Sequence, residues 1–379
     1  MNGRALAPRV ALVRSRYDPA GGAERFVQSA IAALRSRGVS ITIVARQWPG
    51  HDGNAILVDP FHVGSAWRDA SFARAACAEL ARRRFDLVQS HERIACCDVY
   101  RAGDGVHAEF LDQRSRIQSP LARLATRLDP HHRQVLAAER ALFTSPRLRA
   151  VICNSEMVRT EIAARFATPA DKLELIRNAV DAAWFEPGHR AAMRAPVRQQ
   201  LGIPADAHVV LHVGSGFERK GVGTLLRAVA GAASKPWALV VGRDKRSAAY
   251  ARLARQLGIE SRVRFVGSVS DVRPYHAAAD SFMLATIYDP FPNAALEAMA
   301  SGLPVVTTTR CGACEMVAEG QSGFVRDALD VAGFTSALER LDPDTAARMG
   351  VAARDAVAPL TPQSMAERYL ALYERLLNR

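Results

Sequence analysis

Short runs of apolar and β-branched residues alternate along the chain with longer stretches in which apolar residues recur every three or four positions. This pattern is typical of α/β domains, in which amphipathic helices connect the buried strands of a parallel sheet. The predicted strands form two series, which cover residues 10–15, 41–45, 55–58, 85–90, 98–103 and 149–155, and then 208–214, 237–242, 262–267, 281–286 and 304–308. We therefore predict two Rossmann-like domains, in which ligands bind where the loops that follow the strands converge.

The helical pattern and the proline content suggest where the domains begin and end. Residues 23–38 end in a glycine and carry an apolar face formed by Phe26, Val27, Ala30, Ile31 and Leu34. Residues 361–379 form a final amphipathic helix, whereas residues 181–207 are rich in proline and charge and are predicted to be an interdomain linker. The predicted domains are residues 1–185 together with 361–379, and residues 186–360.

Composition agrees with a globular chain. Its 379 residues are enough for two domains of ordinary size, and 49% are hydrophobic and 23% charged. No apolar run approaches the roughly 18 residues that span a bilayer. Arginines interrupt the apolar part of the N-terminus, which lacks the core of a signal peptide, so we expect a cytosolic protein.

The formal net charge of +12 favours an anionic partner. Nucleic acid, an acidic membrane surface and a phosphorylated substrate all fit, and arginines on solvated faces would give the same composition. Aromatic residues make up only 7% of the chain and no nucleic-acid recognition motif is present, which argues against nucleic acid.

Six cysteines are too sparse for a disulfide framework in a chain of this size. Adjacent Cys96 and Cys97 are interpreted as packing residues. Cys311 and Cys314 form a single C-x-x-C with no second pair and no nearby histidine. Two small thiols in a loop are therefore favoured over a zinc or redox site.

Two glycine-containing loops have features of a phosphate site. Gly21 and Gly22 lie between the first strand and the first helix, where amides are exposed at a helix start, although a plain tight turn explains them equally well. At the equivalent place in the second series, "VGSGFERKG" puts Arg219 and Lys220 beside a helix start, where they would attract a diphosphate. The alternative there is an exposed basic turn. Neither loop is a dinucleotide fingerprint or a Walker A loop.

The stretch "DPFPNAALEAMASGLPVV", residues 289–306, contains two carboxylates. Its prolines keep Asp289 in a loop after a strand, and Asn293 is predicted to cap the helix that Gly302 ends. Glu297 then lies in the first or second turn, so both carboxylates border one small volume where vicinal hydroxyls would bind. Stabilisation of the helix dipole alone would explain Glu297 well but Asp289 poorly.

Together these segments resemble a known family. D-x7-E followed by "AMASGLPVV" resembles the E-x7-E signature of family 4 retaining glycosyltransferases, which have the GT-B fold. "YDPAGGAERF", "DVYRAGDGVHAEF", "VGSGFERKG" and "VGRDKR" resemble, in order and spacing, the lipopolysaccharide-core α-1,3-glucosyltransferase group, which transfers glucose from UDP-glucose to inner-core heptose. The resemblance covers essentially the whole chain. It implies an α/β GT-B architecture with an N-terminal acceptor-binding domain, a C-terminal nucleotide-sugar-binding domain and a final helix that returns to the first.

The resemblance also implies a donor site. Asp289 would hydrogen-bond the sugar hydroxyls and Glu297 the ribose hydroxyls. Arg219 and Lys220 would neutralise the departing diphosphate, and Gly21 and Gly22 would line the cleft. Four residues at a helix start would contact sugar and phosphate: Phe291, Pro292, Asn293 and Ala294. Many family members have an arginine in place of Ser215, so the diphosphate would depend more on the other cations. Asp289 is shorter than the usual glutamate, which leaves the donor sugar open.

Across the cleft, the resemblance places Asp104 and His107 near the sugar and the acceptor. It implies retention by front-face attack, in which the departing phosphate oxygen takes the acceptor proton and neither a metal nor a cofactor takes part. Asp104 is the nearest candidate for help with that proton, and His107 is as often a structural residue. Asp342 and Asp344 have D-x-D spacing, but they lie far from the loops, and Asp344 is interpreted as a helix cap.

Residues 110–143 include Arg114, Arg116, Arg123, Arg127 and Arg133 among leucines and isoleucine. We predict that this segment lies on an anionic membrane, because a lipid-anchored acceptor requires a peripheral position on the inner face of the inner membrane. Helices packed on the N-terminal domain with solvated arginines are the alternative.

Four functions stay open from the sequence. The first is transfer of a hexose, preferably glucose, from a UDP-sugar to a lipopolysaccharide core or similar lipid-linked glycan. The second is a family 4 transferase that uses another nucleotide sugar in capsule or exopolysaccharide synthesis. A sugar-nucleotide epimerase with a related fold and a basic nucleic-acid-binding protein are less favoured.

Overall fold

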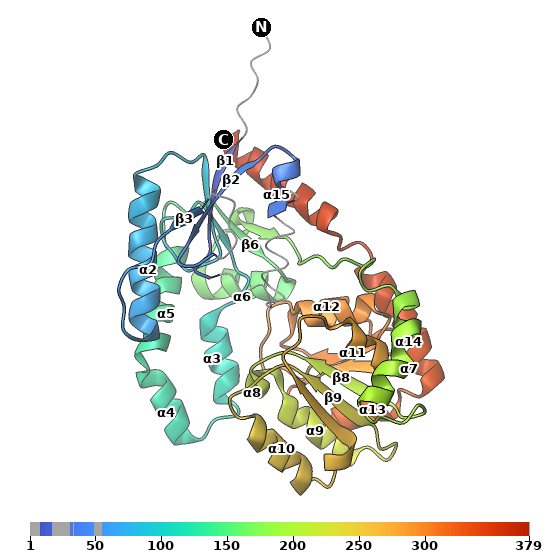
Figure 1. Ribbon diagram of the computed structural model, residues 1–379. Helices are drawn as coiled ribbons and strands as arrows, with labels where there is room; N and C mark the ends of the chain where they lie inside the picture. The colour runs from blue at the N-terminus through green and yellow to red at the C-terminus, as the bar shows by residue number, and fades with distance from the viewer. Residues whose placement is uncertain (1–7, 17–30, 33, 49–54, 379) are drawn as a thin grey trace. The chain divides into compact units, whose positions relative to one another are not determined.

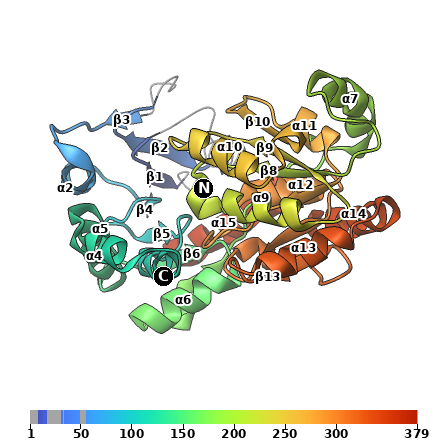
Figure 2. The same ribbon diagram turned by 90° about the horizontal axis from the view of Figure 1, so that it is seen from below.

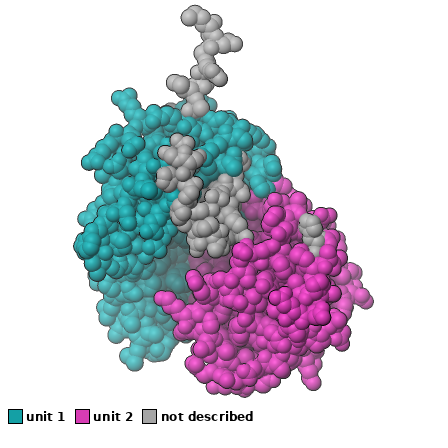
Figure 3. Space-filling view, in the orientation of Figure 1, with its two compact units in different colours: residues 1–178, 362–379 teal, residues 179–361 magenta. Residues whose placement is uncertain are grey.

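The chain consists of two compact units (Figures 1 and 3). The structure, a computed structural model, describes residues 8–16, 31–32, 34–48 and 55–378. Residues 1–178 and 362–379 form unit 1, and residues 179–361 form unit 2. Each unit is built around one parallel sheet with helices on its faces.

Unit 1 contains a seven-stranded sheet in the order β3-β2-β1-β4-β5-β6-β7. All its pairs are parallel, and for example Val10 of β1 lies opposite Ile41 of β2 and Leu87 of β4. The strands are β1 (Arg9–Val13), β2 (Ser40–Ala45), β3 (Ala55–Leu57), β4 (Leu87–Ser90), β5 (Val99–Arg101), β6 (Ala150–Cys153) and β7 (Leu173–Leu175). The first six were predicted from their apolar runs, whereas β7 was not.

Helices cover this sheet on both faces. They are α2 (Gly64–Ala81), α3 (His107–Ser115), α4 (Pro120–Leu128), α5 (Pro130–Phe143), α6 (Glu156–Phe166) and α15 (Pro362–Leu377). The predicted return of the C-terminal helix is confirmed, because the buried hydroxyl of Tyr373 in α15 donates a hydrogen bond to Oε1 of Gln89 in β4, at 2.7 Å. The predicted helix 23–38 lies partly outside the described residues, and none of the described helices is long and apolar enough to cross a membrane.

Unit 2 contains a six-stranded parallel sheet in the order β10-β9-β8-β11-β12-β13. Its strands are β8 (Val209–Val213), β9 (Trp237–Val241), β10 (Val263–Gly267), β11 (Ser281–Met283), β12 (Val305–Thr308) and β13 (Gly323–Arg326). Its helices are α7 (Pro187–Gln200), α8 (Phe217–Lys220), α9 (Val222–Gly231), α10 (Ser247–Gln256), α11 (Arg273–Ala278), α12 (Asn293–Ala300), α13 (Val331–Glu339) and α14 (Pro343–Val357).

Successive strand residues of unit 2 supply two separate apolar cores. Val209 and Leu211 of β8 pack with α12 and α14, while Val210 between them packs with α9 and α13. Both faces of the sheet are therefore buried, which explains why its strands appear in the sequence as continuous apolar runs rather than as alternating ones. Figures 1 and 2 show helices on both sides of this sheet.

The segment predicted to be a linker is instead part of unit 2. Residues 187–200 form α7, which packs against α11, and the guanidinium of Arg198 is almost fully buried. It donates to Oδ2 of Asp280 at 2.6 Å and to the carbonyl of Ala278 at 2.9 Å. The charges that suggested a solvated linker thus satisfy buried acceptors.

The division between the units falls after Asn178, whereas the sequence placed it after residue 185. The amide of Val180 donates to the carbonyl of Leu360 at 2.8 Å, and Val180 and Phe185 both belong to the apolar core of unit 2. These contacts attach the start of the predicted linker to the second unit.

Cys96 is not simply a packing residue, because it forms a disulfide with Cys77 of α2. Their Cα atoms are 5.9 Å apart, which is a usual separation for such a bond. Packing brings the loop after β4 against α2, and the sequence carries no local motif that pairs the two residues. Cys97 agrees with its predicted role, since it is fully buried.

Candidate active site

The carboxyl edge of the sheet in unit 2 gathers the loops that the sequence singled out. β8 and β11 are adjacent strands, and β12 lies on the other side of β11. The glycine-rich loop follows β8, the loop that contains Asp289 follows β11, and Cys311 lies in the loop after β12. Loops after neighbouring parallel strands meet at one edge, which is where α/β sheets bind ligands.

Two glycines fix the path of the first loop. Gly216 and Gly221 flank the single turn α8, and their φ angles are +78° and +76°. A Cβ atom on Gly221 would lie 1.9 Å from the carbonyl oxygen of Ala285, in the loop just after β11. Glycine at this position therefore allows α8 to approach the neighbouring strand closely.

This approach brings the two predicted cations onto the predicted carboxylate. Nζ of Lys220 pairs with Oδ2 of Asp289, and Nη1 of Arg219 lies 3.5 Å from the same oxygen. The side chains of Lys220 and Asp289 are only 12% and 9% exposed, whereas that of Arg219 is 39% exposed. The two cations exceed the carboxylate by one formal positive charge, and because little water screens it, an anion that reaches this place would be attracted.

Backbone hydrogen bonds hold Asp289 from both sides. Its amide donates to the carbonyl of Arg310, and its own carbonyl accepts from the amide of Gly312, at 2.9 and 2.8 Å. On the other side, the amide of Ile287 donates to the carbonyl of Arg219 at 2.9 Å. Asp289 was predicted to lie in a loop, and the structure confirms this and shows backbone hydrogen bonds that hold the loop in place.

The C-x-x-C residues have no bond to each other. Cys311 and Cys314 are both free thiols. Burial, with a smaller contribution from Asp289, raises the pKa of the Cys311 thiol to about 12, so this sulfur stays protonated at neutral pH. No group of three potential metal ligands occurs among the residues that the structure describes.

The helix after Asp289 begins one residue earlier than predicted. Pro292 is the N-cap and Asn293 is the first residue of α12, so Asn293 does not cap the helix. Proline suits this place because it lacks an N–H, and for the same reason it cannot offer the amide that the predicted sugar contact requires. Gly302 ends the helix as expected, with φ +73°.

One face of α12 remains accessible. Phe291 and Pro292 are buried, whereas Asn293, Ala294 and Glu297 are half-buried. The positions i, i+1 and i+4 lie on the same side of a helix, so these three residues border one surface at the start of α12. The predicted donor residues of this helix therefore separate into two buried side chains and three accessible ones.

Ser215, which replaces the arginine common in the resembling family, links two loops. Its hydroxyl accepts a hydrogen bond from the amide of Arg243 at 3.2 Å, in the loop after β9. In the same loop, Asp244 accepts from the amide of Phe217 at 2.8 Å. The loop "VGRDKR" thus supports the start of α8.

The remaining predicted residues belong to unit 1 or lie outside the described residues. Gly21 and Gly22 fall in the part of the chain that the structure does not describe. Asp104 is exposed in the loop after β5, and His107 is the first residue of α3. Unit 1 therefore brings Asp104 and His107 to the carboxyl edge of its own sheet.

Four residues around His107 were not predicted. Oε1 of the buried Glu139 accepts from the backbone amide of His107 at 2.6 Å and from Nε of Arg93 at 3.0 Å. Nε2 of His107 lies 3.0 Å from Nδ1 of His132, whose Nε2 is 3.2 Å from Nη1 of Arg114. The only sequence signal was the histidine pair 131–132, directly after a Pro at a helix start.

The electrostatic environment keeps His107 neutral. Burial, and then the positive charges of Arg93, His132, His131 and Arg114, lowers its pKa to about 3. Asp104 and Glu139 are the acidic groups nearby, and Arg93 is electrostatically coupled to both of them. The imidazole is therefore uncharged throughout the physiological range.

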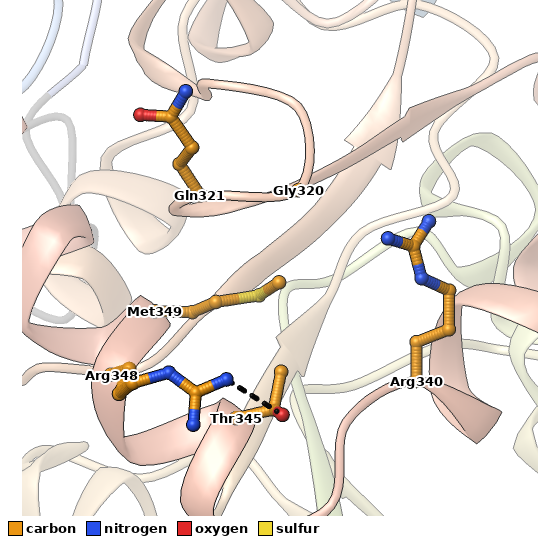
Figure 4. Close-up of a pocket in the computed structure, with 6 residues that line it drawn as sticks. All are labelled: Gly320, Gln321, Arg340, Thr345, Arg348 and Met349. Atoms are coloured by element: carbon orange, nitrogen blue, oxygen red, sulfur yellow. Dashed lines mark hydrogen bonds between the residues drawn. The ribbon is translucent and has the colours of Figure 1, made fainter.

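The D-x-D pair is structural. Asp342, not Asp344 as predicted, caps α14: its carboxylate accepts from the amide of Thr345 at 2.9 Å. Beside it is a cavity of about 440 Å³ lined by Arg340, Thr345 and Arg348 (Figure 4). This cavity lies between the loop before β13 and the start of α14, at the amino edge of the sheet, and so it is separate from the candidate site at the carboxyl edge.

The chain has two Rossmann-like units, and one of them presents cations, a buried carboxylate and a helix start at the carboxyl edge of its sheet. These features are those of GT-B glycosyltransferases. The comparisons agree. Residues 207–344 match the family described as "Glycosyl transferases group 1", and residues 20–184 match "Glycosyltransferase Family 4". Matches to glycosyltransferase family models therefore cover most of each unit.

Two curated relatives act in lipopolysaccharide synthesis by name. The chain is 36% identical over 179 residues to the lipopolysaccharide core biosynthesis glycosyltransferase LpsE of Rhizobium meliloti, a match that covers 46% of the chain and 52% of LpsE. It spans, therefore, about half the length of LpsE. The chain is 27% identical over 331 residues to the lipopolysaccharide glucosyltransferase WaaG of Escherichia coli, covering 83% of this chain and 84% of WaaG.

Solved structures share the fold. The crystal structure of WaaG superposes with a TM-score of 0.82 at 24% identity, covering 96% of this chain and 99% of WaaG. Anabaena HepE in complex with UDP-glucose superposes with a TM-score of 0.71 at 21% identity, covering 97% and 99%. At these identities the likeness establishes the GT-B fold.

Proposed function

We propose that the chain transfers a hexose, with glucose as the preferred sugar, from a UDP-sugar to a lipopolysaccharide core heptose or a similar lipid-linked glycan. The observation that carries the proposal is the pairing of Lys220 and Arg219 with buried Asp289 beside the start of α12. The names of WaaG and LpsE support the glycan, and the UDP-glucose complex of HepE supports the donor.

The donor would bind by exchange of partners. The diphosphate would attract Lys220 and Arg219, and the carboxylate of Asp289 would then accept hydrogen bonds from the sugar hydroxyls. Glu297, on the accessible face of α12, would bind the ribose hydroxyls. The side chains are already close to where the charge develops, so little reorganisation is required in the transition state.

The transfer would proceed with retention. The bond from the sugar C1 to the diphosphate oxygen breaks while a bond from C1 to the acceptor oxygen forms on the same face, and the acceptor proton passes to the departing phosphate oxygen. We assign Asp289 to binding rather than to covalent catalysis, because in the proposed exchange its carboxylate accepts hydrogen bonds from the sugar hydroxyls. Lys220 and Arg219 supply the positive charge, and we propose that no metal or cofactor is needed.

Thermal-shift measurements with UDP-sugars and GDP-sugars test the donor. We expect UDP-glucose to raise the Tm, since a ligand that binds only the folded state stabilises it by mass action. A shift with GDP-sugars alone would favour a family 4 transferase with another donor, as in capsule or exopolysaccharide synthesis. No shift with any nucleotide sugar would contradict the proposed site.

Two substitutions should separate nucleotide binding from turnover. Glu297→Ala is expected to weaken UDP binding roughly tenfold, because hydrogen bonds from the ribose to a carboxylate are lost. Asp289→Ala is expected to lower kcat roughly 100-fold with a smaller effect on UDP binding, since its contacts involve the reacting sugar. Calorimetric titration with UDP and steady-state kinetics measure the two effects.

Glu260, a well-exposed residue remote from the carboxyl edge, provides the matched control for these variants. Glu260→Ala should leave both measurements unchanged. If Glu297→Ala and Asp289→Ala also bind UDP and turn over like the parent, the assignment of the donor site is wrong.

A lipid-linked acceptor requires the enzyme to reach a membrane surface, and α4 provides a suitable face. None of its residues is buried, and Leu121, Leu124 and Leu128 are 82%, 54% and 62% exposed. Their spacing puts them in one stripe, and Arg123 and Arg127 lie on the same short helix. We propose that α4 lies on the anionic inner face of the inner membrane, with the leucines inserted between lipids.

Exposed aromatic residues of unit 1 support the same orientation. Trp67 of α2 shares a cavity of about 450 Å³ with Pro130 and Arg133 at the start of α5, directly after α4. Trp67 is 45% exposed and packs edge-on against Phe61, which is 77% exposed. Tryptophan and arginine are residues that favour the membrane interface.

Replacement of the three leucines of α4 by serine should release the protein from vesicles that contain phosphatidylglycerol. At about 1 kcal/mol or more for each leucine withdrawn from lipid, the triple variant is expected to bind roughly 100-fold more weakly in a co-sedimentation assay. The control is Val351→Ser with Leu329→Ser, two exposed apolar residues of unit 2. Unchanged binding of the triple variant would contradict the membrane proposal.

A further inference from the structure

The hydrogen bonds around His107 have only one possible direction. Arg114 and His132 form a chain that ends on His107: Nη1 of Arg114 is 3.2 Å from Nε2 of His132, and Nδ1 of His132 is 3.0 Å from Nε2 of His107. A guanidinium has donors only, so Nε2 of His132 must carry a lone pair and accept. A neutral His132 therefore has its proton on Nδ1.

The direction passes on to His107. Because Nδ1–H of His132 is a donor, Nε2 of His107 accepts, and the proton of the neutral His107 ring lies on Nδ1. The opposite arrangement would place two N–H groups or two lone pairs against each other. Among the described residues, no side chain or carbonyl accepts a hydrogen bond from Nδ1 of His107, which leaves this N–H for a ligand.

We propose that Arg114 and His132 are positioning residues that hold His107 as the Nδ1–H tautomer, so that His107 donates a hydrogen bond to a substrate oxygen and does not take the acceptor proton. This role rests on the proposed glycosyl transfer. With this tautomer the acceptor proton passes to the departing phosphate, because Nε2 of His107, the nitrogen with the lone pair, already accepts a hydrogen bond from His132.

The charges that surround His107 and His132 favour the neutral form of both imidazoles. From α3 there is Arg114, from α5 there are His131, His132 and Glu139, from the loop after β4 there is Arg93, and from the loop after β5 there is Asp104. Burial and the neighbouring cations lower the pKa of both His107 and His132, although Asp129, the N-cap of α5, acts in the opposite direction on His132. Oε1 of Glu139 is engaged by Arg93 and by the backbone amide of His107, while its buried Oε2 has no hydrogen-bond partner among the described residues.

Long-range proton–nitrogen NMR on histidine-labelled protein reads the tautomer directly and needs no substrate. We expect His107, assigned by loss of its signals in His107→Gln, to be the Nδ1–H form from about pH 5 to about pH 8. In His132→Leu the donor is gone, and the Nε2–H form, the more common tautomer of a free imidazole, should appear. His132→Asn keeps an amide N–H near the position of Nδ1 and should retain the native tautomer.

Kinetics complete the test. We expect His132→Leu to lower kcat roughly tenfold with the KM for the nucleotide sugar unchanged, and His132→Asn to restore most of the rate. His131→Leu, a change in the neighbouring ring that leaves the chain of hydrogen bonds intact, is the control and should alter neither the tautomer nor kcat.

An Nε2–H tautomer in the native protein, or a tautomer that does not respond to His132→Leu, would overturn the proposal. So would a tautomer that switches in His132→Leu without any change in kcat. Failure of the proposed function is separate from these results, because it would be seen as absence of sugar transfer in the native chain whatever the NMR spectrum shows.

Discussion

Substitution of Lys220 by methionine is expected to lower kcat/KM for sugar transfer by roughly 10²- to 10³-fold, the usual effect of removing one group that stabilises developing charge. Lys220 is the less exposed of the two cations on Asp289, at 12% against 39% for Arg219. Its charge would therefore act on the diphosphate through less water and contribute more to departure of the nucleotide. Steady-state kinetics with the donor identified by thermal shift measure the loss.

Stability must be separated from chemistry in this variant. Methionine leaves Asp289 buried with Arg219 as its nearest cation, at 3.5 Å, so the Tm is also expected to fall. Lys220→Arg retains the charge and should recover a substantial part of both activity and Tm. Lys235→Met, on the exposed loop before β9, is the matched control. If Lys220→Met keeps its activity within about threefold of the parent, the proposed role of this lysine in the transfer is wrong.

Burial on both faces explains how much of the fold the sequence reveals. The run 208–214 was predicted as a strand because every residue of β8 from Val209 to His212 is buried, and parallel strands of this kind need no alternation. β7 and β13 were not predicted because they are short edge strands with half-buried positions, and they contain Glu174 and Arg326 respectively. A charged residue in so short a strand leaves too few apolar residues to stand out from a loop, whereas β3, an equally short edge strand, has no charged residue and was predicted.

Errors at the ends of helices have a common cause. The prolines of α7 suggested a linker, but Pro187 occupies the first position of the helix, where a missing N–H costs nothing, and α7 continues through Pro196. The caps of α12 and α14 differ from the predicted ones because a proline and an earlier aspartate, Pro292 and Asp342, take those places. Several polar residues near a helix start are equally suited to capping, and local geometry selects among them.

The sequence singled out residues of the candidate site one by one, but it did not indicate the contacts between them. Position after a strand identified Lys220 and Asp289 separately, and a sequence separation of 69 residues gave no sign that they form an ion pair. His132 was missed because its role exists only once α3 and α5 pack together. The function of a histidine depends on its hydrogen-bond partners, and here tertiary packing brings those partners together.

Gly221→Ala is expected to disrupt both the stability of unit 2 and the donor site. The φ of +76° alone costs about 1 kcal/mol for alanine, and the new Cβ would lie 1.9 Å from the carbonyl oxygen of Ala285 and 2.8 Å from its Cβ. Backbone must move, which brings the total to about 3–5 kcal/mol and the expected fall in Tm to roughly 10 °C by calorimetry. Movement of α8 away from β11 also separates Lys220 from Asp289, so activity should fall roughly 100-fold.

Gly216→Ala is the matched control, since it has nearly the same backbone angle but no atom within 4 Å of its Cβ position. It should incur only the conformational cost, about 1 kcal/mol, which corresponds to a fall in Tm of about 2–4 °C. The difference between the two variants isolates the close approach of α8 to β11. Equal losses in the two would mean that this approach is not what holds the cations against Asp289, and that the glycines act only through their backbone angles.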